Sequence, residues 1–80
     1  MDTTTAIKNR INNLCALNGI TINKLADKSG IPASSLKNIL YGKSLNPKIL
    51  TLKILCDGLG ITLGEFFSTK EFDNLEQEIK

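Results

Sequence analysis

Apolar side chains recur along most of the chain at the three- and four-residue spacing of a helix, and Gly or Pro residues interrupt this pattern. The first periodic segment predicts a helix over residues 5–18. Thr4 or Thr5 is a suitable cap for its start, and Gly19 supplies the left-handed residue that ends many helices. The apolar face of this helix comprises Ile7, Ile11, Leu14 and Cys15.

Four shorter helices are expected to follow. Their predicted ranges are 22–28, 33–41, 47–59 and 62–67. Thr21 caps the first of them, while Pro32 and Pro47 mark the starts of the next two, since proline is tolerated in the first turn of a helix. Thr62 and Glu65 fit the Thr-x-x-Glu capping box of the last. The side chains expected to face inward are Leu25, Ala26, Leu36, Ile39, Leu40, Ile49, Leu52, Leu55, Cys56 and Leu59.

The last part of the chain is less regular. Phe72, Leu75 and Ile79 keep a helical spacing, so this segment forms either a sixth helix or a partly ordered extension. We therefore predict an all-α fold, a compact five-helix bundle over residues 1–68, followed by an acidic tail or short extra helix over residues 69–80. Twelve Leu and ten Ile provide an aliphatic core, because aromatic residues make up only 5% of the 80-residue chain.

Composition excludes several classes of protein. The chain has no His, which removes His-based catalysis and His-ligated metals, and no carboxylate pair or Gly-rich phosphate loop suggests an enzyme. No cofactor or small-molecule ligand is indicated. Cys15 and Cys56 lie in apolar helical patterns and are interpreted as core thiols of a cytoplasmic protein, with a disulfide as the alternative. No signal peptide or membrane-spanning run is visible.

Positive charge is concentrated in the first part of the chain. Before Ser68 there are eight Lys or Arg and four Asp or Glu, whereas the remainder has two Lys and four acidic residues. Between residues 24 and 53, only Asp27 opposes the lysines. The lysines in this stretch are Lys24, Lys28, Lys37, Lys43, Lys48 and Lys53. Such clustering is typical of a nucleic-acid-binding face, although a solvated lysine-rich surface would look the same.

The second and third predicted helices are short and joined by a turn containing Gly30, which is the arrangement of a helix-turn-helix. Ala26 is small enough for the position at which the second helix comes closest to the third. In such a unit the second helix braces the third, whose exposed side chains enter the major groove of DNA. The outward face of the third helix comprises Ala33, Ser34, Lys37, Asn38 and Tyr41.

At this point the sequence resembles the lambda-repressor and Cro-like transcriptional regulators. The resemblance covers residues 5–68 and depends on the order and spacing of several fragments. These are Ile22 to Ile31, Ser35 to Ile39, Gly42-Lys43, Asn46-Pro47, Thr51-Leu52, Leu59 to Ile61 and Glu65 to Phe67. It implies a five-helix domain that binds double-stranded operator DNA, usually as a homodimer.

The resemblance also implies roles for individual residues. Ala33, Ser34 and Asn38 fall where the family reads bases, and Lys37 is expected to reach a base or a phosphate. The predicted phosphate contacts are Thr21, Asn23, Lys43, Ser44 and Asn46, to which the amphipathic Tyr41 is added.

The sequence departs from the family at two places. Ile22 stands where many members have Gln, and Pro32 and Ala33 replace a common cap and a common Gln. Few direct base contacts are therefore expected. Ile22 and Leu45 are expected to be exposed.

The leading interpretation is a sequence-specific DNA-binding regulator that acts as a repressor and as a dimer. The alternative is a protein-interaction module such as an antitoxin or adaptor. The acidic tail favours the alternative. The expected dimer interface is Phe66, Phe67, Phe72, Leu75 and Ile79, unless the tail folds back on its own domain.

Overall fold

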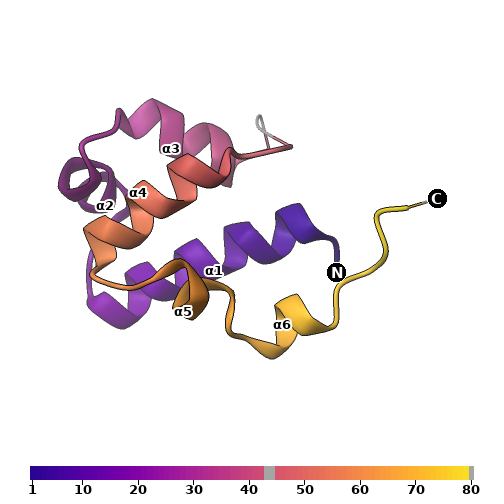
Figure 1. Cartoon of the computed structure of the whole chain (residues 1–80). Helices are drawn as coiled ribbons and strands as arrows, with labels where there is room; N and C mark the ends of the chain where they lie inside the picture. The colour runs from indigo at the N-terminus through magenta and orange to yellow at the C-terminus, as the bar shows by residue number, and fades with distance from the viewer. Residues whose placement is uncertain (43–44, 80) are drawn as a thin grey trace.

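The structure is a computed structural model that describes residues 1–42 and 45–79, and its regular elements are six helices joined by short turns (Figure 1). They are α1 (Thr3–Asn18), α2 (Ile22–Ser29), α3 (Ala33–Leu40), α4 (Ile49–Leu59), α5 (Leu63–Phe67) and α6 (Lys70–Asp73). The predicted all-α bundle is therefore confirmed, and the short extra helix is present as the single turn α6. No helix within the described ranges is long and apolar enough to cross a membrane.

Two helix starts differ by two residues from the prediction. Helix α1 begins at Thr3 because Asp2 is its cap, and the Asp2 carboxylate accepts a hydrogen bond of 2.7 Å from the N–H of Thr5. This hydrogen bond lowers the pKa of Asp2. Helix α4 begins at Ile49 and not at Pro47, because Lys48 is still extended, with φ −67° and ψ 142°.

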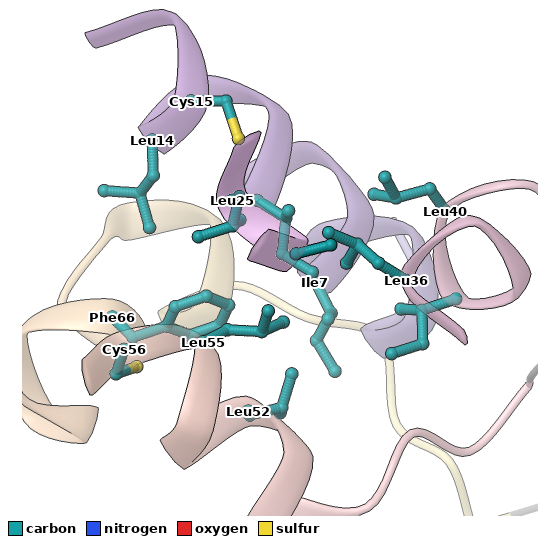
Figure 2. Packing of buried hydrophobic residues seen from close by; sticks show 13 residues of the cluster. Ile7, Leu14, Cys15, Leu25, Leu36, Leu40, Leu52, Leu55, Cys56 and Phe66 are labelled. Carbon is teal, nitrogen blue, oxygen red and sulfur yellow. The ribbon is translucent and has the colours of Figure 1, made fainter. Parts of the chain in front are cut away.

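The core is formed by the inner faces of α1 to α4 and closed by the ring of Phe66 (Figure 2). Phe66, Leu25, Leu36 and Leu55 are fully buried, so residues from four different helices meet at the centre. Ile49 is an exception to the predicted core. Its side chain is exposed, because the buried face of α4 begins one turn later, at Leu52.

Helices α2 and α4 approach each other closely, and small residues allow this. Gly58 of α4 faces Ser29 of α2, and a Cβ on Gly58 would lie 3.3 Å from the Cβ of Ser29 and closer still to its hydroxyl. Ala26 is almost fully buried, as expected from its place on α2. Larger side chains at these positions would push α2 away from the helix that supports it.

Arg10 joins α1 to the end of α5. Its Nε donates a hydrogen bond of 2.7 Å to the carbonyl of Phe66, and its Nη2 donates one of 2.8 Å to the carbonyl of Glu65. Carbonyl groups in the last turn of a helix lack partners within the helix and attract positive charge. The two hydrogen bonds of Arg10 therefore stabilise α5 in the position that places Phe66 in the core.

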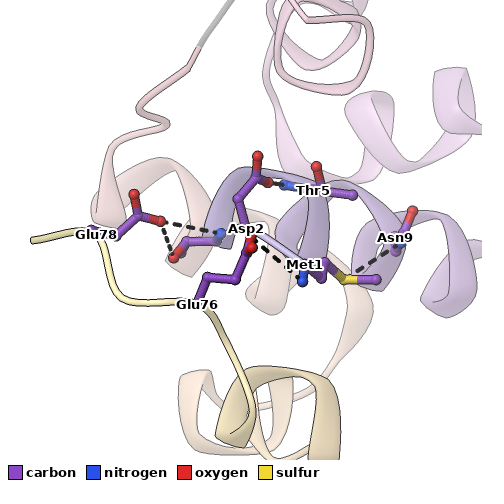
Figure 3. A network of polar contacts seen from close by, with 7 residues as sticks. Met1, Asp2, Thr5, Asn9, Glu76 and Glu78 are labelled. Carbon is purple, nitrogen blue, oxygen red and sulfur yellow. Dashed lines mark hydrogen bonds and ion pairs between the residues drawn. The ribbon is translucent and has the colours of Figure 1, made fainter. Parts of the chain in front are cut away.

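The tail folds back on its own domain. Phe72 packs edge-on against Phe67, with ring centroids 4.9 Å apart, and lies 6.0 Å from Phe66. Beyond α6, the N–H of Glu76 donates a hydrogen bond of 3.2 Å to the carbonyl of Met1, and the Thr3 hydroxyl donates one of 2.8 Å to Glu78. The Glu76 carboxylate also lies 3.6 Å from the α-amino group of Met1, and Figure 3 shows these contacts between tail and α1.

These contacts correct the expected dimer interface. Phe66 is fully buried, Phe67 and Phe72 pack against the core, and Leu75 is half-buried, so most of the proposed apolar stripe is already covered within one chain. Only Ile79 of that set is strongly exposed.

Both cysteines are free and buried, in agreement with their interpretation as core thiols. Burial raises the pKa of Cys15 and of Cys56, because a thiolate loses solvation inside an apolar core. The reactive thiolate form of each is therefore rarer than in an exposed cysteine.

We expect Phe72→Ala to lower the free energy of unfolding by about 1–3 kcal/mol, less than the full cost of removing a completely buried ring, because Phe72 is half-buried. Urea unfolding followed by circular dichroism measures this. Ile79→Ala is the control, since Ile79 is 87% exposed and its removal should change stability little. Equal stability of Phe72→Ala and the unmodified chain would show that the tail is not part of the folded unit.

Candidate nucleic-acid interface

Helix α3 presents a polar face on the side away from the core. Leu36, Ile39 and Leu40 are buried, and the exposed residues between them are Ser34, Ser35, Lys37 and Asn38. Ala33 departs from the expected outward face, because it is half-buried and packs against the core cluster. Of the four residues predicted to read bases, Ser34, Lys37 and Asn38 are therefore exposed on α3, whereas Ala33 is only partly accessible.

The turn between α2 and α3 sets how far α3 projects. Gly30 ends α2 in the left-handed conformation, with φ 70°, and its N–H donates to the carbonyls of Ala26 and Asp27. The N–H of Ile31 donates a further hydrogen bond of 3.1 Å to the carbonyl of Ala26. This is the hydrogen-bonding pattern of a tightly closed helix end, so the orientation of the two helices is fixed locally as well as by the core.

The start of α2 carries two of the predicted phosphate contacts. Thr21 caps the helix by accepting a hydrogen bond of 3.0 Å from the N–H of Lys24, and its side chain and that of Asn23 are exposed. Ile22 was expected to be exposed, but it is half-buried and packs against the core. The position where many family members have Gln thus contributes to packing here.

The segment after α3 carries the remaining predicted contacts. Tyr41 is the residue that ends α3, and it is 68% exposed. Gly42 has φ 85°, and Asn46 is exposed. Lys43 and Ser44 lie outside the described residues. The segment is attached to α1, since the Thr4 hydroxyl donates a hydrogen bond of 2.9 Å to the carbonyl of Leu45, a residue that is exposed as expected.

Lys8 is a cation near this segment that sequence reasoning did not single out. Its Nζ lies 3.8 Å from the position that a Cβ on Gly42 would occupy. Lys8 belongs to α1 and is 34 residues away from Gly42 in the chain, so no local pattern connects the two. The tertiary fold, which places Lys8 of α1 beside Gly42, brings this charge to the turn.

The lysines differ in whether a carboxylate is already beside them. Lys24 lies 3.8 Å from Asp27, and Lys53 pairs with Asp57. Among the described residues, Lys28, Lys37 and Lys48 have no carboxylate within ion-pair distance. Two tail carboxylates, Glu76 and Glu78, lie at the start of α1. Cationic groups next to α3 are therefore available to an external anion, while these acidic groups are engaged elsewhere.

The surface around α3 carries polar and charged side chains. Within residues 1–42 and 45–79, no group of His, Cys, Asp or Glu is arranged to hold a metal ion. The surface offers hydroxyl, amide and ammonium groups on a rigid helix, which suits the hydrogen-bonding edges of bases and the oxygen atoms of phosphates.

Comparisons with known proteins agree with this description. A family model for the Cro/C1-type helix-turn-helix DNA-binding domain matches residues 10–71. Among solved structures, the chain is similar to prophage Lp1 protein 11, with a TM-score of 0.81 and 26% identity over 94% of this chain and 100% of that one. It is also similar to an HTH_3 family transcriptional regulator from Vibrio cholerae, with a TM-score of 0.76 and 27% identity over 88% of this chain and 38% of that one. No curated protein matched.

The family match covers most of the chain, including α2, the turn at Gly30 and α3. The members of this family are DNA-binding regulators of transcription and not enzymes. The chain belongs to the Cro/C1-type helix-turn-helix DNA-binding family.

Proposed function

We propose that the protein is a sequence-specific regulator that places α3 in the major groove of double-stranded DNA and acts as a repressor by occupying its operator. The observation that carries this proposal is the polar face of α3, where Ser34, Lys37 and Asn38 are exposed while the opposite face is buried. An α-helix fits the major groove, and a rigidly held helix keeps its side chains in register with the base edges.

Each reading residue has a role that suits its chemistry. The Asn38 amide can both donate to and accept from adenine, and the Ser34 hydroxyl can bond to several bases. Lys37 reaches a guanine or a neighbouring phosphate. Ala33 contributes an apolar contact with a thymine methyl through the part of its side chain that the core leaves uncovered.

Phosphate contacts surround this face and position it. We assign them to polar and charged groups at the start of α2 and after α3. They are Thr21, Asn23, Tyr41, Lys43, Ser44 and Asn46, with Lys8 and Lys28 added from the structure. Such contacts need reach and charge but carry no sequence information, so they supply affinity and register.

We further propose that the protein binds as a homodimer to an inverted repeat. One recognition helix covers only a few base pairs, which is too little to select a site within a genome. Two copies related by a two-fold axis match the pseudo-symmetry of DNA, with half-sites about 34–36 Å apart.

Selection of bound sequences from a pool of random duplex DNA tests this function. We expect the selected sequences to share an inverted repeat whose half-sites are separated by about one helical turn. Selection from a pool of random single-stranded RNA is the control and should yield no enrichment. Failure to enrich any duplex sequence would contradict sequence-specific binding, and enrichment of an unrepeated site would contradict the dimer.

We expect Ser34→Ala and Asn38→Ala to relax selectivity at particular base pairs, each by about 1–3 kcal/mol, because each removes a hydrogen bond to a base edge. Affinities for operator duplexes with single base changes provide the measurement. Ser35→Ala is the matched control, since Ser35 is exposed on the same helix but lies off the predicted reading face. Loss of affinity to the same extent on operator and random DNA would remove Ser34 and Asn38 from the reading residues.

We expect Lys43→Ala to weaken binding to all duplexes equally and to reduce the slope of log affinity against log salt by about one unit, because one phosphate contact is lost. Titrations at several salt concentrations measure the slope. Lys70→Ala removes the same charge from α6 and should leave the slope unchanged. An unaltered slope in Lys43→Ala would exclude Lys43 as a phosphate contact.

A further inference from the structure

Two positions at the contact between α2 and α4 carry residues that the helices themselves do not favour. They are Ser29, the last residue of α2, and Gly58, the next-to-last residue of α4. The φ angle of Gly58 is not positive, unlike that of Gly60, so the backbone of α4 does not require glycine at this position. Glycine within a helix also lowers the stability of that helix relative to alanine. The reason for Gly58 therefore lies outside α4.

Ser29 has a comparable local cost. Its Oγ is buried, and within residues 1–42 and 45–79 this atom has no hydrogen-bond partner. A buried hydroxyl without a partner loses its hydrogen bonds to water and gains none in return. An alanine at residue 29 would avoid this cost, so the stability of α2 alone does not explain the serine.

The geometry of the contact explains both residues together. A Cβ at residue 58 would lie 3.3 Å from the Cβ of Ser29, 3.4 Å from its Cα, and closer to its Oγ than non-bonded atoms can approach. The serine hydroxyl thus occupies the space that a side chain at residue 58 would need. Rotation of the hydroxyl alone does not remove the conflict, because the Cβ of Ser29 stays nearer than an ordinary van der Waals contact.

A change at this contact reaches α3 through α2. Among the pairs of helices, α2 packs most extensively on α4 and next on α3 (Figure 1). Ser29 directly precedes the turn, in which the N–H groups of Gly30 and Ile31 donate hydrogen bonds to carbonyls of α2. This closed turn and the packing of α3 on α2 join the two helices into one unit, so we expect α3 to follow any displacement of α2 from α4.

We propose that Ser29 and Gly58 are positioning residues that determine the register of the reading helix on DNA, an inference that rests on the DNA-binding function proposed above. The predicted base contacts lie on α3, whereas Asn46, a predicted phosphate contact, lies in the segment that leads into α4. The contact between α2 and α4 therefore sets the distance between groups that read bases and groups that hold the DNA backbone. Hydrogen bonds span only about 2.7–3.2 Å, so a displacement of a fraction of an ångström weakens the base contacts.

Gly58→Ala tests the proposal on DNA. We expect this variant to bind the duplex selected from the random pool about 10-fold more weakly and to bind random duplex within about two-fold, because base contacts carry the selectivity. Gly64→Ala is the matched control, since a Cβ on Gly64 of α5 would meet only the Thr62 hydroxyl, at 3.7 Å. A purely structural role of Gly58 would lower the melting temperature and leave the ratio of the two affinities unchanged, and this result would overturn the proposal.

The double variant Gly58→Ala/Ser29→Gly moves the side-chain volume from α2 to α4. Only the Cα of residue 29 then faces the new Cβ, at 3.4 Å. With Ser29→Gly it completes a double-mutant cycle, in which we expect the losses of the two single variants to cancel and not to add. If Gly58→Ala does not fold, recovery of the fold in the double variant supports the proposal, and loss of the fold in both contradicts it.

Amide resonances measured by NMR without DNA provide a second readout. We expect the amides of Ser34 and Asn38, which lie on α3 away from the contact, to shift in Gly58→Ala and to return in the double variant. Gly64→Ala should leave them in place. Unshifted α3 resonances in Gly58→Ala would show that the contact does not position the reading helix.

The two readouts separate this inference from the proposed function. If the unmodified chain binds no duplex, the DNA-binding proposal fails, while the amide resonances still decide whether the contact positions α3. If DNA is bound specifically and neither the affinity ratio nor the resonances respond to Gly58→Ala, the function stands and Ser29 and Gly58 are not positioning residues.

Discussion

The candidate site depends on the packing of α2 against both α3 and α4. Leu25, Leu36 and Leu55 are fully buried, one from each of these helices, and they determine where the polar face of α3 points. The close approach of Gly58 to Ser29 brings α4 near enough for this contact. Because protein cores are close-packed, a change of one methyl group here alters the position of α3 as well as the free energy of unfolding. Fold and recognition therefore depend on the same few contacts.

Periodicity and turn residues were sufficient to predict most of the fold. The apolar spacing in α1 to α5 identified nearly all the core, and Gly19, Gly30 and Gly60 each end a helix in the left-handed conformation. The prediction of buried residues failed at positions where apolar periodicity does not distinguish a buried side chain from an exposed one. Ile49 follows the spacing of Leu52 and Leu55 but is exposed, and Phe72 follows the spacing of an unpaired stripe but is packed.

The candidate site could be predicted only in part, for a different reason. The exposure of Ser34, Lys37 and Asn38 follows from helical geometry once the apolar face of α3 is known. The position of the Lys8 charge beside this site does not follow from helical geometry. It arises because the fold places Lys8 of α1 next to Gly42, which is 34 residues away in sequence. The half-buried state of Ala33 and Ile22 also depends on neighbouring helices, which no local pattern describes. Long-range packing decides these cases.

Tyr41 has a consequence for observing the molecule at work. The chain has one Tyr and no Trp, so almost all of its intrinsic ultraviolet fluorescence comes from this single ring. The ring is 68% exposed at the end of α3, between the proposed reading face and the apolar residues that start α4. Stacking near a nucleobase or enclosure by a neighbouring protein surface changes the emission of a phenol. Tyr41 fluorescence can therefore report binding at the end of α3 without an added dye.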